Sequence, residues 1–292
     1  MKIKNYKGIL LAGGMGTRLG PTTLSTSKHL LPIYDKPMIY YSLSILMLCG
    51  IKDIAIIVNE YDLNNFQKLL GNGEDFGINL TYIIQKKPKG IAEAIILCEK
   101  FLNNQNCCLV LGDNIFYGQN FTEILTNCLI NNKGATVLCH PVIDSKNFGI
   151  LNLDKNKAPI KIVEKPLKSK SNLAVTGIYF YDSSVTKIVK SLKYSKRGEL
   201  EITDLNNKYI KKNNLKYHIL GRGFSWLDTG SHEKLFEAAK FVEVIQSNQG
   251  YFIACLEEIA LKNKWISKKK IKNKINKLKG TNYSNYLKKI IV

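Results

Sequence analysis

The chain has 292 residues, of which 45% are hydrophobic, and this size and composition suit one large globular domain or two small ones rather than a disordered chain. Its 43 basic and 23 acidic residues give a formal net charge of +20, yet only Arg18, Arg197 and Arg222 are arginines. Nucleic-acid recognition favours the bidentate guanidinium group, and the lysines are scattered along the chain. We therefore expect no nucleic-acid partner and interpret the lysine excess as a composition bias.

The sequence also argues against a membrane or secreted protein. It has no basic leader followed by an apolar stretch and a cleavage site, and no apolar run of about 18 residues. Its seven cysteines are an odd number without a C-x-x-C pair, which favours reduced, buried thiols over disulfides or metal ligands. We expect a cytoplasmic protein that has no membrane contact.

The amino-terminal apolar run 8–12 predicts a buried strand, and it leads directly into Gly13, Gly14, Gly16 and Arg18. Glycines allow backbone N–H groups to approach phosphate oxygens, and an arginine can neutralise their charge. The spacing fits neither the dinucleotide fingerprint nor the P-loop. This stretch is either a third kind of phosphate-binding loop or a purely structural turn.

Apolar runs and helical patterns alternate through the first part of the chain. Strands are predicted at 8–12, 53–58, 80–84 and 107–111, separated by helices at 38–49, 62–70 and 91–101. This order is typical of an α/β fold of the Rossmann-like type, a mostly parallel sheet with helices on both faces. Ligands of such folds bind at the carboxyl ends of the strands.

The second half is richer in strands. Strands are predicted at 135–140, 149–153, 160–163, 174–181 and 217–220, with helices near 184–192 and 203–211. We expect these strands to extend the same sheet as a lobe, because no Pro/Gly/Ser linker separates the halves. The pattern is helical from about Glu233, so we divide the chain into a core at 1–232 and a helical region at 233–292. The lysine run 262–279 predicts a solvated helix face.

Several motifs, in a fixed order, resemble the family of sugar-phosphate nucleotidylyltransferases, and most closely its thymidylyl branch. They are the segment 26–41 (TSKHLLPIYDKPMIYY), Gln85 with Pro88 and Gly90, Leu-Gly-Asp-Asn at 111–114, Glu-Lys-Pro at 164–166, Arg-Gly-Glu-Leu-Glu-Ile-Thr-Asp at 197–204 and Trp-Leu-Asp-Thr-Gly at 226–230. The resemblance covers nearly the whole chain. An ordered set of this kind is far more specific than any one of its members.

The resemblance implies an enzyme that uses dTTP and glucose 1-phosphate to make dTDP-glucose and pyrophosphate. The sugar phosphate would attack the α-phosphorus of the nucleotide directly, a reaction that depends on positioning and charge neutralisation. Asp113 and Asp228 match the family's Mg²⁺ ligands, and Arg18 and Lys165 complete the implied catalytic set.

The resemblance also assigns binding residues. Those implied for the nucleotide are Gly13, Gly16, Thr17, Arg18, Lys28, Gln85, Gly90 and Asp113. Those implied for the sugar phosphate are Asn114, Gly149, Glu164, Lys165, Val175 and Arg197. These residues imply that the sugar binds in the strand-rich lobe. Taken alone, Asp113 or Asp228 could simply cap a turn, and the lysines could be solvated charges. The ordered set favours the functional interpretation.

Some positions depart from the family pattern. His29 replaces the usual glutamine, Lys89 an aspartate, and Phe148 and Leu173 tyrosines. Two alternatives therefore stay open: a UTP-dependent uridylyltransferase and a non-catalytic nucleotide-sugar sensor of the same fold. The sensor is disfavoured because it would have no need of both metal carboxylates.

The resemblance further implies a homotetramer with a second nucleotide-sugar site near the carboxy-terminal helices. Gln249-Gly250 and the segment 257–260 resemble that region, whereas Gln119 stands where the family tends to have histidine. Feedback inhibition is therefore left open.

Overall fold

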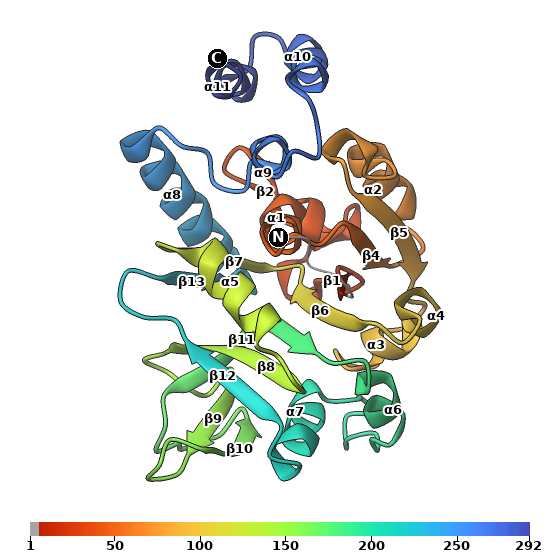
Figure 1. The fold of residues 1–292 in the computed structure, drawn as a ribbon, viewed down its shortest axis with the longest axis vertical. Coiled ribbons are helices and arrows are strands. Elements are labelled where there is room, and N and C mark those ends of the chain that lie inside the picture. The colour runs from red at the N-terminus through yellow and green to blue at the C-terminus, as the bar shows by residue number, and fades with distance from the viewer. Residues whose placement is uncertain (1–5) are drawn as a thin grey trace.

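The computed structural model describes residues 6–292 and has a nine-stranded sheet at its centre (Figure 1). The strand order is β10-β9-β11-β6-β1-β4-β5, with β8 paired to β11 and β12 paired to β8. These strands are β1 (Tyr6–Leu11), β4 (Asp53–Val58), β5 (Asn79–Ile84), β6 (Asn106–Leu111), β8 (Ala135–Pro141), β9 (Gly149–Leu153), β10 (Pro159–Glu164), β11 (Leu173–Tyr181) and β12 (Leu215–Ile219). The predicted α/β architecture is confirmed.

The amino-terminal part of the sheet is parallel. β1 lies between β4 and β6, with Leu10 opposite Ile56 on one side and Val110 on the other, and β5 continues the sheet beyond β4. Alternate side chains of β1 enter different cores: Ile9 belongs to the buried cluster on one face and Leu10 to that on the other. A strand buried on both faces is a continuous apolar run, which is why β1, β4 and β6 could be predicted from the sequence.

Helices cover both faces of this part of the sheet. They are α1 (Met38–Leu48), α2 (Leu63–Leu70), α3 (Glu93–Leu97), α4 (Glu99–Leu102) and α5 (Phe121–Ile130), with short 3₁₀ turns η1 (Thr17–Leu19), η2 (Thr22–Leu24), η3 (Lys28–Leu30) and η4 (Glu74–Phe76). The single helix predicted at 91–101 is two short helices that meet at Cys98. Helix α5 was not predicted.

The strand-rich second half extends the same sheet, as expected. β11 pairs antiparallel with β6, β8 and β9, so the sheet becomes mixed at this point. Helices α6 (Val185–Lys190) and α7 (Ile202–Lys211) lie beside these strands in Figure 1. The lobe and the parallel part therefore share one sheet.

Two short two-stranded sheets were not predicted. β2 (Pro32–Ile33) pairs with β3 (Lys36–Pro37), and β7 (Asn114–Tyr117) pairs antiparallel with β13 (Ser225–Asp228). The Trp-Leu-Asp-Thr-Gly motif at 226–230 is therefore mostly strand. Asp228 is the last residue of β13.

Four helices close the chain: α8 (His232–Gln249), α9 (Leu256–Lys262), α10 (Lys268–Lys277) and α11 (Asn282–Ile290). Ser231, Ser267 and Thr281 cap α8, α10 and α11, and Gly250 ends α8 with a φ of 71°. Leu256 and Leu287 pack in the same buried cluster as Leu10. The carboxy-terminal helices thus share the main core, and the division at residue 232 stays a prediction.

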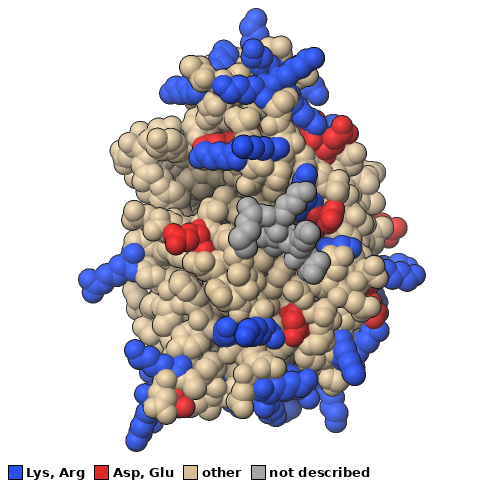
Figure 2. Space-filling view, in the orientation of Figure 1, with Lys and Arg blue, Asp and Glu red and all other residues tan. Residues whose placement is uncertain are grey.

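The lysine run 262–279 corresponds mainly to α10, whose buried residues are Ile271 and Ile275. Figure 2 shows Lys and Arg side chains spread over the visible face and gathered at the end of the molecule where α10 and α11 lie. All seven cysteines are buried and free. Across residues 6–292 no helix has the length and apolar character that a membrane span requires.

Candidate active site

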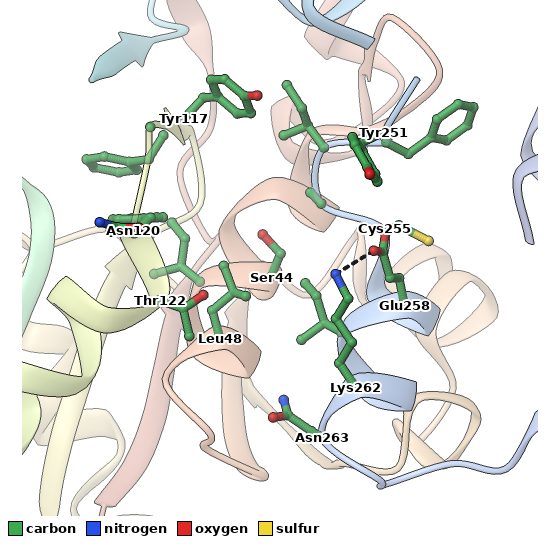
Figure 3. A pocket seen from close by; sticks show the side chains of 18 residues that line it. Ser44, Leu48, Tyr117, Asn120, Thr122, Tyr251, Cys255, Glu258, Lys262 and Asn263 are labelled. Atoms are coloured by element: carbon green, nitrogen blue, oxygen red, sulfur yellow. Dashed lines mark ion pairs between the residues drawn. The ribbon is translucent and has the colours of Figure 1, made fainter. Parts of the chain in front are cut away.

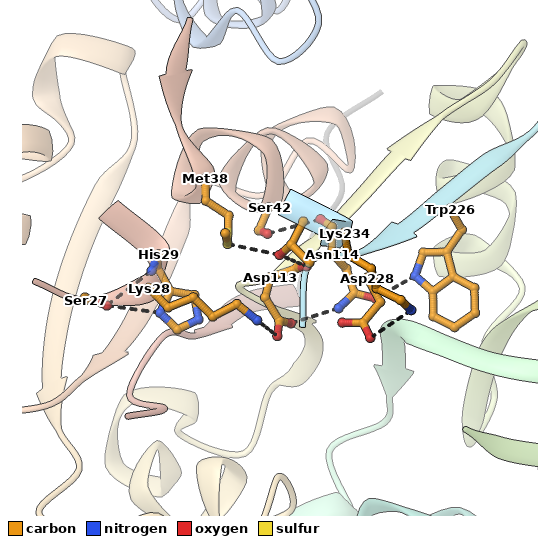
Figure 4. A network of polar contacts seen from close by, with 11 residues as sticks. Ser27, Lys28, His29, Met38, Ser42, Asp113, Asn114, Trp226, Asp228 and Lys234 are labelled. Carbon is orange, nitrogen blue, oxygen red and sulfur yellow. Dashed lines mark hydrogen bonds and ion pairs between the residues drawn. The ribbon is translucent and has the colours of Figure 1, made fainter. Parts of the chain in front are cut away.

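The two carboxylates predicted as metal ligands are brought together by the pairing of β7 with β13. This pairing places Asp228 opposite Asn114, directly beside Asp113 (Figure 4). Thr229 fixes the junction, because its backbone N–H and its Oγ1 both donate to the carbonyl oxygen of Asp113, at 3.2 and 2.8 Å. A long-range strand pairing therefore joins two motifs that are far apart in the sequence.

The two carboxylates have opposite electrostatic environments. The Asp113 carboxylate accepts from Lys28 Nζ at 2.7 Å and from Asn114 Nδ2 at 2.9 Å. Burial alone would raise the pKa of Asp113, but Lys28, His29 and these two hydrogen bonds together lower it. The pKa of Asp228 is raised, first by burial and then by the nearby charge of Asp113. The pair is thus a concentration of negative charge that a cation would stabilise.

Lys28 is held in place by its neighbours along the chain. Its side chain is only 7% exposed, and the N–H of Ser27 donates to Asp62 Oδ1 at 3.0 Å, which ties this segment to the start of α2. His29 lies next to it, with Nδ1 3.2 Å from Ser27 Oγ, and burial lowers the pKa of His29 to about 4. His29 is therefore neutral at physiological pH, and Lys28 is the cation that faces Asp113.

The glycine-rich loop forms one wall of a cavity above this ion pair. Gly16 has a φ of 60°, and a Cβ there would lie 3.0 Å from Lys28 Cβ. A Cβ on Gly230 would lie 3.4 Å from Arg18 Nη2 and 3.3 Å from Asp228 Oδ2, so the guanidinium group and this carboxylate both lie next to Gly230. The cavity has a volume of about 220 Å³ and is lined by Gly14, Gly16, Thr17, Arg18, Leu19, Lys28, His29, Asp113 and Gly230. Five residues predicted to bind the nucleotide, from three separate motifs, thus line one cavity: Gly16, Thr17, Arg18, Lys28 and Asp113.

Gln85 packs against the start of the glycine-rich loop. A Cβ on Gly13 would lie 2.6 Å from Gln85 Oε1, while Gln85 Nε2 donates to Glu93 Oε2 at 2.8 Å. Glu93 also accepts from the backbone N–H of Lys89 at 3.1 Å. No sequence signal pointed to Glu93, because an acidic residue in a first helical turn is ordinary. The structure makes Glu93 the residue that orients the Gln85 amide.

Gly90 is required by a close approach of two motifs. It has a φ of 99°, and a Cβ there would lie 2.3 Å from the carbonyl oxygen of Leu200. The backbone of Leu200 donates to Lys89 O at 2.7 Å and accepts from Ala92 N at 3.2 Å. The segment 197–204 thus packs against the loop that follows Gln85.

Asn114 and Trp226 link the carboxylates to the lobe. Trp226 Nε1 donates to Asn114 Oδ1 at 2.6 Å, and Asn114 in turn donates to Asp113. Phe148, directly before Gly149, packs on Trp226 with ring centroids 5.0 Å apart. In this structure Asn114 orients Asp113. Its implied contact with the sugar stays a prediction.

The other residues implied for the sugar phosphate lie in the lobe. A Cβ on Gly149 would lie 3.2 Å from Glu164 Oε2, which accepts from Thr203 Oγ1 at 2.5 Å. Lys165 is exposed and has a φ of 44°. The buried Val175 belongs to β11, where it lies opposite Cys139.

Arg197 has partners of its own within the motif 197–204. Its Nη2 donates to Glu201 Oε1 at 2.9 Å and lies 3.5 Å from Glu199 Oε2, and the side chain is half exposed. The structure does not bring it to Asp113 or Asp228 through any hydrogen bond or ion pair. A contact with the sugar phosphate would therefore have to compete with Glu201.

The donor set fits a hard divalent cation. Asp113 lines the cavity with Arg18 and Lys28, and Asp228 lies close by at Gly230. The repulsion between the two carboxylates would be relieved by a cation. Within residues 6–292 no cluster of three or more His, Cys, Asp or Glu side chains could hold a metal. Mg²⁺ commonly keeps waters and binds through one or two carboxylates plus substrate phosphates. The remaining ligands would therefore come from the nucleotide and water.

A larger, mostly apolar cavity of about 460 Å³ lies between α1, α5 and α9 (Figure 3). Glu258 and Lys262 form an ion pair of 2.7 Å on its wall. The segment 257–260, which resembles the family's second nucleotide-sugar site, contributes Glu258 and Ile259 to this cavity. Feedback inhibition stays a prediction.

Comparisons with known proteins show the family of this chain. The model of the family described as nucleotidyl transferase matches residues 7–244. The chain is 51% identical to the glucose-1-phosphate thymidylyltransferase of Neisseria meningitidis, over 98% of this chain and 99% of that protein. It is 48% identical to the Xanthomonas campestris protein of the same name, over 96% and 95%.

Two solved structures share the fold of this chain. One, described as a glucose-1-phosphate thymidylyltransferase of Bacillus anthracis, is 45% identical with a TM-score of 0.74 over 81% of this chain and 94% of that chain. A UDP-glucose pyrophosphorylase at 24% identity, with a TM-score of 0.73 over 82% and 99%, shares the fold. The chain therefore belongs to the nucleotidyl transferase family.

Proposed function

We propose that this protein transfers the thymidylyl group of dTTP to glucose 1-phosphate, giving dTDP-glucose and pyrophosphate. The observation that carries the proposal is that Arg18, Lys28 and Asp113 line one cavity beside the glycine-rich loop, with Asp228 next to Arg18 at Gly230. The similarity to glucose-1-phosphate thymidylyltransferases over nearly the full length of the chain supports the choice of substrates.

In this reaction an oxygen of the sugar phosphate forms a bond to the α-phosphorus, and the bond from that phosphorus to the bridging oxygen of pyrophosphate breaks. Because no proton must be removed from an ionised phosphate, the protein's task is to position the two anions and to balance their charge. Arg18, beside Gly230, and Lys28 would neutralise the triphosphate. Lys165 would approach the sugar phosphate from the lobe.

Base selection would fall to the Gln85 amide. Its Oε1 faces the backbone at Gly13 and its Nε2 is held by Glu93, so its orientation is fixed before the nucleotide binds. A fixed amide can distinguish one base from another by the pattern of hydrogen-bond donors and acceptors on the edge of the base. Thymine and uracil share that edge, so UTP should be the second-best nucleotide.

Asp113 and Asp228 would hold Mg²⁺ together with the substrate phosphates. Bound there, the ion supplies neutralisation of the charge that builds up as the two phosphates meet. We further propose that the protein is a homotetramer and that it acts in the cytoplasm, where nucleoside triphosphates are available. Both proposals follow from its membership of the family.

The test is a matrix of pyrophosphate-release assays that crosses dTTP, UTP, CTP, GTP and ATP with several hexose 1-phosphates. We expect dTTP with glucose 1-phosphate to give the highest kcat/KM, followed by UTP. A tenfold preference for UTP or CTP would show that the protein transfers a uridylyl or cytidylyl group and not a thymidylyl group. Nucleotide-sugar binding without turnover of any pair would instead identify a sensor.

A further inference from the structure

Lys234 occupies a position in α8 that is electrostatically unfavourable for a cation. Ser231 caps the helix by accepting from the backbone N–H of Lys234, so this residue lies in the first turn. The amino-terminal end of a helix carries partial positive charge and favours acidic residues. A lysine there weakens the helix slightly, which suggests that its charge serves another purpose.

The ammonium group points toward the site rather than along the helix. Lys234 Nζ lies 3.9 Å from Asp228 Oδ2 and 5.7 Å from the centre of the Phe148 ring. Phe148 precedes Gly149 and packs on Trp226, so both contacts place the charge between a metal carboxylate and the sugar side of the site. The side chain is 43% exposed, which leaves Nζ accessible to a ligand.

The cations flank the two carboxylates from both ends. In Figure 4, Lys28 reaches Asp113 from the side of His29, whereas Lys234 reaches Asp228 from the side of Trp226. Lys28 and Arg18 both line the cavity of the glycine-rich loop, where the triphosphate is proposed to bind. Lys234 lies outside that cavity, beside Asp228, and is therefore placed to meet the other phosphate together with Lys165.

We propose that Lys234 binds the phosphate group of the hexose 1-phosphate and sets its affinity. This rests on the proposed function, because it needs a sugar-phosphate substrate. An incoming phosphate carries up to two negative charges and must approach the Asp228 carboxylate, so an ammonium group at that point reduces the repulsion. Arg197 is engaged with Glu201, which leaves Lys234 the more available of these two cations.

Three variants and a matched control test the proposal. Lys234→Met removes the charge but keeps most of the aliphatic stem, Lys234→Arg keeps the charge, and Lys234→Glu reverses it. The control is Lys240→Met, which removes an exposed lysine of the same helix whose partner is Glu243 at 2.9 Å. KM for each substrate, kcat and Tm are measured for every protein.

We expect Lys234→Met to raise KM for glucose 1-phosphate by roughly fivefold, the size of an exposed charge contact, while KM for dTTP changes less than about twofold. Lys234→Glu should raise it further, and Lys234→Arg should restore most of the affinity. The control should match the wild type. A rise in both KM values together, or an unchanged KM for the sugar phosphate, would overturn the proposal.

The substrate preference of the wild type shows whether a failure concerns the role of Lys234 or the proposed function. If it prefers another nucleotide or hexose 1-phosphate, the specificity proposed above is wrong, but the Lys234 variants are then measured with the preferred pair. A selective rise in KM for that hexose 1-phosphate still supports the role of Lys234. Lack of turnover by the wild type with every pair would reject both.

Discussion

Gly90 offers a sharp test of how the site is held together. Replacing it with alanine places a Cβ 2.3 Å from Leu200 O and 2.7 Å from Leu200 N, on a backbone whose φ is 99°. The backbone conformation alone costs about 2 kcal/mol for a residue with a side chain. Leu200 must also move, which weakens its hydrogen bonds to Lys89 and Ala92, each worth about 1 kcal/mol.

These contributions predict that Gly90→Ala lowers the free energy of unfolding by about 4 kcal/mol, a large share of the roughly 5–15 kcal/mol that typically stabilises a domain. Gly198 is the matched control, since it has a φ of 73° and a Cβ added there would meet no atom within 4 Å. Gly198→Ala should cost only about 1 kcal/mol, from the backbone conformation.

Urea unfolding followed by circular dichroism measures both variants, and steady-state kinetics gives their KM values. We also expect Gly90→Ala to raise KM for dTTP more than KM for glucose 1-phosphate, because the loop at Gly90 follows Gln85. Equal destabilisation by the two substitutions would show that contact with Leu200 contributes nothing, and would refute the reasoning.

Three further predictions concern charge at the site. Arg18→Lys should lower kcat/KM at least about tenfold, or about 1.4 kcal/mol, with little change in Tm, because a lysine cannot grip two phosphate oxygens in the planar geometry of a guanidinium group; near-normal kinetics would contradict this. EDTA should abolish activity and Mg²⁺ restore it, while Asp113→Ala and Asp228→Ala should lose several orders of magnitude in kcat but keep the fold by circular dichroism; turnover like the wild type in either variant would remove that residue from the metal site. The pKa of His29 is about 4 in the folded protein and 6.5 for an unperturbed histidine. Between these pH values the unfolded chain binds more protons than the folded protein, so the free energy of unfolding falls as the pH drops from 6.5 toward 4. Urea unfolding at several pH values should therefore show that the wild type loses up to about 3 kcal/mol more than His29→Gln over this range, and parallel losses would show that His29 is not buried in its neutral form.

Much of the fold could be predicted from the sequence alone. β4 was predicted with its observed bounds, and β1 and β6 to within a residue or two, because each is an apolar run buried in the parallel part of the sheet. β5 was also predicted to within a residue, although it is the exposed edge strand. The glycine loop and the two aspartate motifs were recognised as local patterns. A buried strand or a short motif can be recognised from local sequence, because each depends on residues that are neighbours along the chain.

The tertiary structure alone decided how the motifs meet. β7 and β13 have four residues each, too few for a period to appear, and their pairing joins positions more than 100 residues apart. That pairing places Asp228 beside Asp113, and the start of α8 then places Lys234 beside Asp228. Glu93 is another residue whose role depends on what folds against it. Non-local pairing and side-chain direction are settled only when distant segments pack, and the charges at this site depend on both.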